Sequence, residues 1–200
     1  MQKTIINIGL DIDDTINKSA KKEFKEHAIL FCKEKGIEFK ENTKELYVKT
    51  RFGFSDEHTQ EFIQRFVEKI DMQSAFYKDC INVMHKMKQH DLFDIRFIMI
   101  TARSSANYSD VHAKTANYLS NGNVPFDKLV VDAEDKLKVC LEHDIHIFVD
   151  DSYKHCENVA SAGHIKTFIR NQPYNQHFEH SGVTRIESLQ SIYEHICKAA

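Results

Sequence analysis

Two acidic residues, two positions apart, directly follow an apolar run near the start of the chain. Residues 5–10 are mostly aliphatic and lead into Asp11, Asp13 and the hydroxyl of Thr15. Two carboxylates that lie this close repel each other unless a cation or a shared proton lowers the cost. Because no arginine lies nearby in the sequence, a divalent metal ion is the expected partner. The alternative is a turn in which an aspartate only caps the next segment.

Polar residues follow two later apolar runs in the same way. One run ends at Thr101, another ends at Asp150 and Asp151, and Lys136 is expected to open a helix between them. If the runs are strands of one parallel sheet, their carboxyl ends lie at the same edge. These groups would then converge with the first pair of acids.

Together, such groups could carry out phosphoryl transfer. Carboxylates bind Mg²⁺, which bridges and neutralises phosphate oxygens. One carboxylate can attack phosphorus to give an aspartyl-phosphate, and a second acid can protonate the leaving oxygen. Each group alone has an ordinary alternative explanation. A threonine or a pair of aspartates often caps a helix, and a lysine is usually a surface residue. Lys138 is also a second candidate for the role of Lys136. The order of the whole set favours phosphoryl transfer.

The elements that must position these groups alternate along the chain. Strand-like runs occupy residues 5–10, 95–100, 129–131, 145–149 and 165–169, and helical patterns occupy 107–119, 135–143, 153–161 and 186–199. This alternation predicts an α/β fold, a Rossmann-like parallel sheet with helices on both faces.

The stretch between the first two strands has a different character. Residues 21–35, 55–70 and 77–87 show helical spacing, with Gly36 as a natural stop and Ser55 as an N-cap. We therefore expect an α/β core at residues 1–16 and 91–200, with an inserted helical unit at 17–90.

Composition limits the function classes. The 200 residues are 42% apolar and 28% charged with a net charge of −3, which gives no basic surface for nucleic acids or anionic membranes. Five scattered cysteines indicate reduced thiols. No apolar run is long enough for a membrane span or signal segment, so we expect a soluble, cytoplasmic protein. A homodimer is compatible with the sequence.

The order of the motifs resembles the haloacid dehalogenase-like (HAD) hydrolase superfamily. The matching residues are Asp11-Ile12-Asp13-Asp14-Thr15, Thr101, Lys136 and Val149-Asp150-Asp151. The resemblance implies a HAD-like core with a helical cap that closes over the site, and the acid at Asp13 points to phosphatases. Asp14 stands where the family often has glycine, a departure that bears on the turn geometry, although aspartate tolerates turns.

The resemblance implies a role for each matched residue. Asp11 would be the nucleophile and a Mg²⁺ ligand, and Asp13 would be the general acid/base with its backbone carbonyl on the metal. Asp150 would be the direct metal ligand. Asp151 would support it through water or by orienting Lys136. The transferring phosphoryl group would be bound by Thr101, Ala102 and Lys136.

Specificity would come from residues around that site. In the expected cap, aromatic residues beside an arginine could stack on a base and pair with an anion, or they could simply pack the cap's own core. The candidates for substrate contact are Tyr47, Arg51, Phe52, Phe54, Arg103 and Arg170.

A narrower resemblance concerns the substrate. Arg170 followed by Pro173-Tyr174-Asn175 is similar to the 5′(3′)-deoxyribonucleotidase-like branch and its bacterial nucleotidases, as is the sequence Thr101-Ala102-Arg103. It implies a nucleoside monophosphate as substrate; the alternative is a proline-fixed surface turn. Other readings are a phosphatase of sugar phosphates or other small phosphate esters, a phosphotransferase, and a non-catalytic nucleotide-binding protein.

Overall fold

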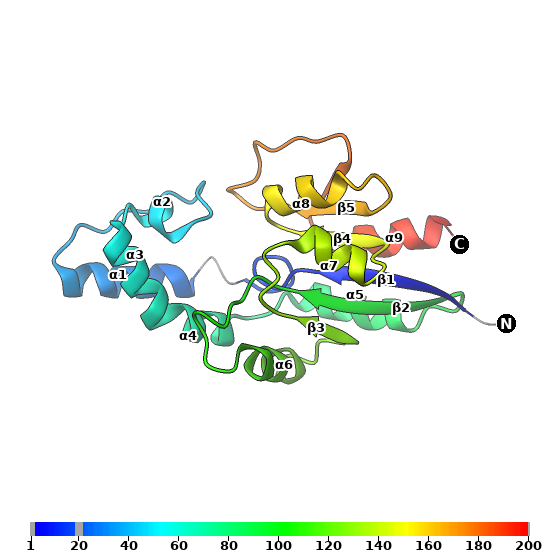
Figure 1. Cartoon of the computed structure of the whole chain (residues 1–200), viewed down its shortest axis with the longest axis horizontal. Helices are drawn as coiled ribbons and strands as arrows, with labels where there is room; N and C mark the ends of the chain where they lie inside the picture. Colours follow the sequence, from blue (N-terminus) through cyan, green and yellow to red (C-terminus); the bar gives the residue numbers. More distant parts are fainter. Residues whose placement is uncertain (1–2, 19–21, 200) are drawn as a thin grey trace.

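A six-stranded parallel sheet forms the centre of the molecule (Figure 1). The computed structural model describes residues 3–18 and 22–199. The sheet has the order β3-β2-β1-β4-β5-β6, with bounds Lys128–Val130, Phe93–Ile100, Thr4–Leu10, Ile147–Asp150, Lys166–Arg170 and Val183–Ile186. All neighbouring strands pair in parallel. The predicted fold class is therefore confirmed.

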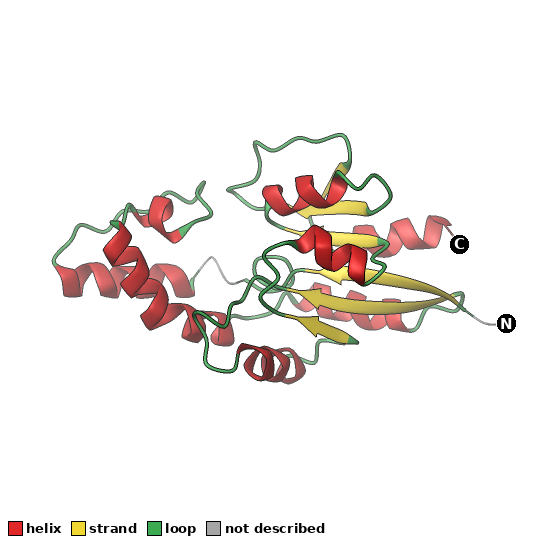
Figure 2. Cartoon of the chain, viewed as in Figure 1, coloured by secondary structure: helices red, strands yellow, loops and turns green. Residues whose placement is uncertain are grey.

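Helices cover both faces of the sheet (Figure 2). On one face, buried residues of β1, β2 and β4 pack with α5 (Lys78–Lys88), α6 (Val111–Asn121) and α9 (Gln190–Ala199). On the other face, Phe148 and Ile100 pack with α7 (Lys136–Glu142) and α8 (Tyr153–Ala160). Burial on two faces explains why the central strands are almost continuously apolar.

The strand order of the sheet reverses at β1. The chain builds β2 and β3 on one side of β1 and then returns to build β4, β5 and β6 on the other side. In open α/β sheets, ligands bind at the carboxyl ends of the strands where this reversal occurs. The ends of β1 and β4 are therefore the place to look for a site.

The segment between β1 and β2 is helical, as predicted. It contains α1 (Glu23–Lys35), α2 (Val48–Phe52), α3 (Asp56–Phe62), the π-helical turn η1 (Ile63–Val67), α4 (Glu68–Gln73) and α5. Helices α1–α4 lie beyond the carboxyl ends of the strands (Figure 1). Their buried side chains form a cluster of their own that is rich in phenylalanine. Lys21, the first residue of the predicted first helix, lies outside the described residues.

Helix α5 packs differently from the four helices before it. Its buried side chains Cys80, Ile81, Met84 and Met87 belong to the same hydrophobic cluster as the sheet. We therefore propose that the inserted unit ends near residue 73, before α5, and not at residue 90.

Capping residues that the sequence predicted mark the ends of two helices. Gly36 ends α1 in the left-handed conformation with φ of 65°, and the Ser55 hydroxyl accepts a hydrogen bond from His58 N at the start of α3. One sequence prediction was wrong: residues 186–189 do not begin the last helix, because Ile186 ends strand β6 and α9 starts at Gln190.

Two further expectations can be compared with the structure. All five cysteines are free thiols. Among the described residues, no helix combines the length and the apolar composition that crossing a bilayer requires.

Candidate active site

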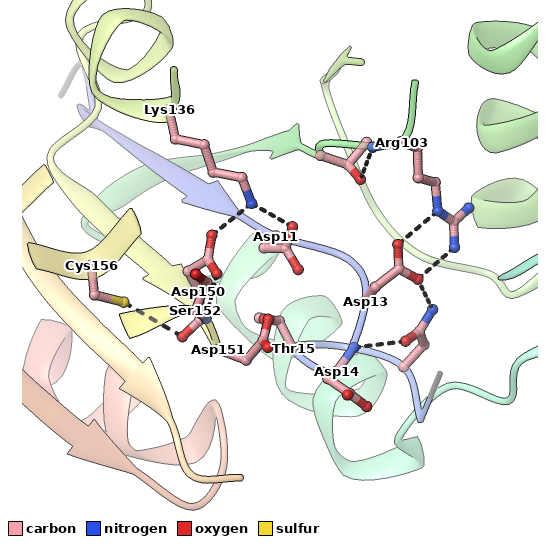
Figure 3. A network of polar contacts seen from close by, with 12 residues as sticks. Asp11, Asp13, Asp14, Thr15, Arg103, Lys136, Asp150, Asp151, Ser152 and Cys156 are labelled. Atoms are coloured by element: carbon pink, nitrogen blue, oxygen red, sulfur yellow. Dashed lines mark hydrogen bonds and ion pairs between the residues drawn. The ribbon is translucent and has the colours of Figure 1, made fainter. Parts of the chain in front are cut away.

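The carboxyl ends of β1 and β4 bring the predicted residues together (Figure 3). Asp11 follows β1, and its backbone N donates to Val149 O at 3.0 Å, while Asp150 is the last residue of β4. Lys136 is the first residue of α7, whose start is capped by the Asp135 carboxylate. The sheet edge and one helix N-terminus therefore fix the three side chains.

Lys136 lies between two carboxylates. Its Nζ donates to Asp11 Oδ1 and to Asp150 Oδ2, each at 2.6 Å, and its side chain is 2% exposed. Burial alone would lower the pKa of Lys136, but the two carboxylates raise it above its usual value, so the group is an ammonium. Burial raises the pKa of Asp11 to about 7 despite the opposing charge of Lys136.

Asp151 is the third buried carboxylate of the site. Its Oδ1 accepts from the Thr15 hydroxyl at 3.3 Å and its Oδ2 accepts from the Tyr174 hydroxyl at 2.6 Å. Burial and the neighbouring carboxylates of Asp150 and Asp11 raise its pKa well above the usual range. The expectation that Asp151 orients Lys136 gains no support, because Thr15 and Tyr174 are the partners observed.

The three carboxylates fit a cation. Asp11, Asp150 and Asp151 offer oxygen atoms that all lie within 4.8 Å of one another. Hard divalent cations such as Mg²⁺ prefer carboxylate oxygens. Because burial opposes ionisation of Asp11 and Asp151, a bound cation would relieve a cost that Lys136 alone does not remove.

Asp13 has a partner that the sequence did not suggest. Arg103 donates from Nε and Nη2 to the two Asp13 oxygens at 2.9 and 2.8 Å, and Asn17 Nδ2 donates at 2.9 Å. Burial opposes ionisation of Asp13, but the Arg103 guanidinium holds the pKa of that carboxyl below its usual value. The carboxylate turns toward Arg103 and away from Asp11 (Figure 3).

Arg103 also links Asp13 to the inserted helices. Its Nη2 donates to the backbone carbonyl of Asp71 on α4 at 3.3 Å, and its guanidinium lies 4.8 Å from the Tyr118 ring. The Asp71 carboxylate accepts a hydrogen bond from the Tyr108 hydroxyl. Burial, with the charge of Asp13, raises the pKa of Asp71 to about 8. Arg103, a predicted substrate contact, is thus engaged in an ion pair with Asp13, and its contact with substrate stays a prediction.

Thr101 and Ala102 lie where the sequence predicted, directly after β2. Both line the same cleft as Asp11 and Lys136. The Thr101 hydroxyl accepts from the backbone N of Arg103 at 3.2 Å. Its own hydrogen atom therefore remains available to a ligand.

The cleft has a volume of about 320 Å³ and lies between the strand ends and the inserted helices. From the inserted unit it is lined by Phe24, Leu46, Tyr47, Val48, Arg51, Val67 and Asp71. Of the predicted specificity residues, Tyr47, Arg51 and Arg103 line it. Arg51 is paired there with Glu41, to which Nη2 donates at 2.8 Å.

Three other predicted specificity contacts are not found in the cleft. Phe52 and Phe54 are 2% and 4% exposed and pack in the phenylalanine cluster of the inserted unit, which was the alternative explanation. Arg170 is buried beside α5, where its guanidinium lies 4.6 Å from the Tyr77 ring and its Nη1 contacts Cys80 Sγ.

Sequence reasoning missed Tyr174, Tyr108 and Asp71 as parts of this network. Tyr174 stands inside the Pro-Tyr-Asn motif that the sequence singled out, so that motif was a usable signal. Tyr108 and Asp71 lie in no motif, and nothing in the sequence marks them.

Comparison with solved structures shows the same fold in HAD-superfamily proteins. A subfamily IA HAD hydrolase from Geobacter sulfurreducens matches with a TM-score of 0.58 and 14% identity, covering 96% of both chains. YfnB from Bacillus subtilis, named as a HAD hydrolase and solved with magnesium, matches with a TM-score of 0.62 and 15% identity over 97% of this chain and 99% of its own.

A third similar structure contains a phosphorylated sugar. A CbbY variant from Rhodobacter sphaeroides in complex with xylulose 1,5-bisphosphate matches with a TM-score of 0.59 and 14% identity, covering 92% of this chain and 95% of its own. No protein-family model and no curated protein matches the sequence. At such identities these comparisons show that the chain has the HAD-like fold.

Proposed function

We propose that the protein is a Mg²⁺-dependent phosphomonoesterase that acts through an aspartyl-phosphate on Asp11. The observation that carries this proposal is the position of Lys136, whose ammonium contacts Asp11 and Asp150 at 2.6 Å at the carboxyl ends of β1 and β4. A carboxylate held beside an ammonium, a hydroxyl and further carboxylates is suited to attack an anionic phosphorus centre.

The metal would be held mainly by Asp11 and Asp150, with Asp151 beside them and the backbone carbonyl of Asp13 as a further ligand. When bound, Mg²⁺ would neutralise phosphate oxygens during transfer. The fit rests on the three carboxylate oxygens within 4.8 Å of one another.

The proposed reaction has two steps. An Asp11 oxygen bonds to phosphorus while the bond to the leaving oxygen breaks, and Asp13 gives that oxygen its proton. A water molecule then attacks phosphorus, the bond to Asp11 breaks, and Asp13 takes the proton of the water. Thr101 and Lys136 would bind the phosphoryl oxygens in both steps.

The ion pair of Asp13 places a condition on this scheme. A carboxyl that faces Arg103 and has a lowered pKa holds no proton for a leaving group. Asp13 must therefore turn from Arg103 toward Asp11 and gain a proton before the first step. Arg103 also contacts the Asp71 carbonyl on α4, so the group that holds Asp13 in this position is itself held by the inserted helices.

Two substrate classes fit the cleft. A nucleoside monophosphate is favoured by the Pro-Tyr-Asn motif and by rings of Phe24, Tyr47 and Tyr108 in the cleft wall. A sugar phosphate is favoured by the burial of Phe52 and Phe54 away from the cleft, and by the bisphosphate ligand of the CbbY structure.

The test is a phosphatase screen with Mg²⁺ over nucleoside monophosphates and sugar phosphates. We expect phosphate release from at least one class, its loss in Asp11→Asn, and no loss in the control Asp91→Asn, which changes an exposed aspartate. Labelled oxygen from water should appear in the released phosphate if water is the acceptor. A wild-type protein that hydrolyses nothing across this panel would contradict the proposal.

A further inference from the structure

We propose that Tyr174 is a positioning residue for the metal-binding carboxylates, and that residues 171–176 fasten this side of the active site. The inference rests on the proposed function, because it concerns the same metal site. It assigns a role to the Pro-Tyr-Asn motif, which the proposed chemistry does not use.

The Tyr174 hydroxyl contacts two carboxylates at once. Its oxygen lies 2.6 Å from Asp151 Oδ2 and 2.8 Å from Asp14 Oδ2, and the residue is 4% exposed. Among the described residues, the Asp151 carboxylate accepts one further side-chain hydrogen bond, the longer one from the Thr15 hydroxyl at 3.3 Å. Tyr174 therefore makes the shortest contact that holds Asp151 in its orientation toward Asp11 and Asp150.

The loop that carries Tyr174 is itself fixed to the strand ends. Asn175 Nδ2 donates to Asp151 O at 2.8 Å and to Arg170 O at 2.7 Å. Asn175 Oδ1 in turn accepts from the backbone N of Gln172 at 3.1 Å. Since Gln172 and Asn175 are 1% and 0% exposed, these bonds are shielded from water. A tyrosine on this loop can hold its hydroxyl at a fixed point.

The same loop holds the turn that carries Asp13. Asp14 has a left-handed φ of 56°, a conformation that aspartate adopts more readily than most residues. Gln172 Nε2 donates to the Asp14 carbonyl at 2.6 Å, and Tyr174 contacts its carboxylate. These contacts explain how aspartate can occupy a turn position where glycine is common, and they make Asp14 part of the support for the site.

Tyr174 does not line the cleft of Asp11 and Lys136. Its hydroxyl contacts Asp151 and Asp14 instead, so we expect its effect to act through these two carboxylates. Groups that orient metal ligands in this way change metal affinity by about 10–100-fold when they are removed.

The test is Tyr174→Phe in the full chain, which keeps the ring and removes only the hydroxyl. Mg²⁺ binding without substrate would be measured by isothermal titration calorimetry. We expect an affinity about 10–100-fold weaker than in the wild type. In phosphatase assays, the Mg²⁺ concentration for half-maximal activity should rise by a similar factor, while kcat at saturating Mg²⁺ changes much less. A role in packing alone would not produce this split.

Tyr153→Phe is the matched control, because Tyr153 lies nearby on α8 and its ring contacts His177 and Phe178. Mg²⁺ affinity within twofold of wild type in Tyr174→Phe would overturn the inference alone. A wild-type protein that binds no Mg²⁺ would overturn the proposed function as well. If Tyr174→Phe does not fold, Gln172→Met decides by the same criterion, since it removes the contact to Asp14 and keeps the side-chain length.

Discussion

Replacing Asp11 with asparagine should stabilise the metal-free protein while it abolishes phosphatase activity. The reason is that Asp11 is a buried carboxyl whose ionisation is opposed by its surroundings more than Lys136 compensates. The amide of asparagine has nearly the same shape and keeps an oxygen that can accept from Lys136 Nζ, but it carries no charge to bury.

The magnitude follows from the pKa of Asp11, which burial raises from 3.8 to about 7. In the range between these values the folded state binds more protons than the unfolded state, so the free energy of unfolding falls as the pH rises. A pKa difference of about three between the folded and unfolded states corresponds to about 4 kcal/mol. This much of the free energy of unfolding is lost once the pH exceeds the folded-state pKa of Asp11. After allowance for a weaker contact to Lys136, we expect a net gain of about 2 kcal/mol for Asp11→Asn at pH 8.

Thermal unfolding at several pH values would measure this effect. In EDTA at pH 8, the variant should melt about 4–8 °C above the wild type, and the difference should shrink toward pH 5. Saturating Mg²⁺ should raise the melting temperature of the wild type more than that of the variant. A variant that is less stable than wild type in EDTA at pH 8, or a difference that does not depend on pH, would refute this reasoning.

Three other substitutions test the packing and the charges around the site. Lys136→Met should lower the free energy of unfolding by about 3–5 kcal/mol in urea titrations, because it leaves two buried carboxylates without their ammonium. Arg103→Gln should be less stable than wild type near neutral pH. The difference should close as the pH falls below 3.8, because the stability from the lowered pKa of Asp13 is complete above that unfolded-state value and is lost as the pH falls through the folded-state pKa. Gly122→Ala should cost about 1–3 kcal/mol, because its Cβ would lie 2.0 Å from the Phe76 ring.

Exposed positions provide controls for these variants. Lys138→Met on the same helix removes a lysine whose side chain is 70% exposed, and Arg96→Gln removes an exposed arginine paired with Asp94. Exposed ion pairs contribute about 0–1 kcal/mol, so both controls should stay near wild type. Equal losses in Lys138→Met and Lys136→Met would contradict the role of burial. A pH-independent loss in Arg103→Gln would contradict the pairing with Asp13.

The sequence predicted the positions of the candidate site residues correctly where they lie at the carboxyl ends of the parallel strands. Asp11, Thr101 and Asp150 each follow an apolar run, and parallel strands bring such residues to one edge without further information. Lys136 was predictable as the opening residue of a helix on the same edge. Their convergence therefore followed from local patterns and one topological rule.

Other features depend on contacts that local patterns do not encode. Arg103 pairs with Asp13 from 90 residues away, from a loop that has no periodicity. Phe52 and Phe54 beside Arg51 could equally stack on a ligand or fill a core, and only the packing of α1 and α3 decides. Strand β6 escaped prediction because it is four residues long, lies at the sheet edge and has the polar residues Thr184 and Arg185 at its centre.

The charge balance of the site explains why its acids behave differently. Two close carboxylates need a compensating cation, and Asp11 and Asp13 obtain positive charge from different side chains. Asp13 receives a guanidinium with two hydrogen bonds, and its pKa falls. Asp11 shares one ammonium with Asp150, and its pKa rises to about 7, while the pKa of Asp151 rises as well. The carboxylates that lack enough positive charge are therefore those of Asp11 and Asp151, beside the proposed nucleophile. A divalent cation bound there would assist the attack of Asp11 and would leave Arg103 paired with Asp13.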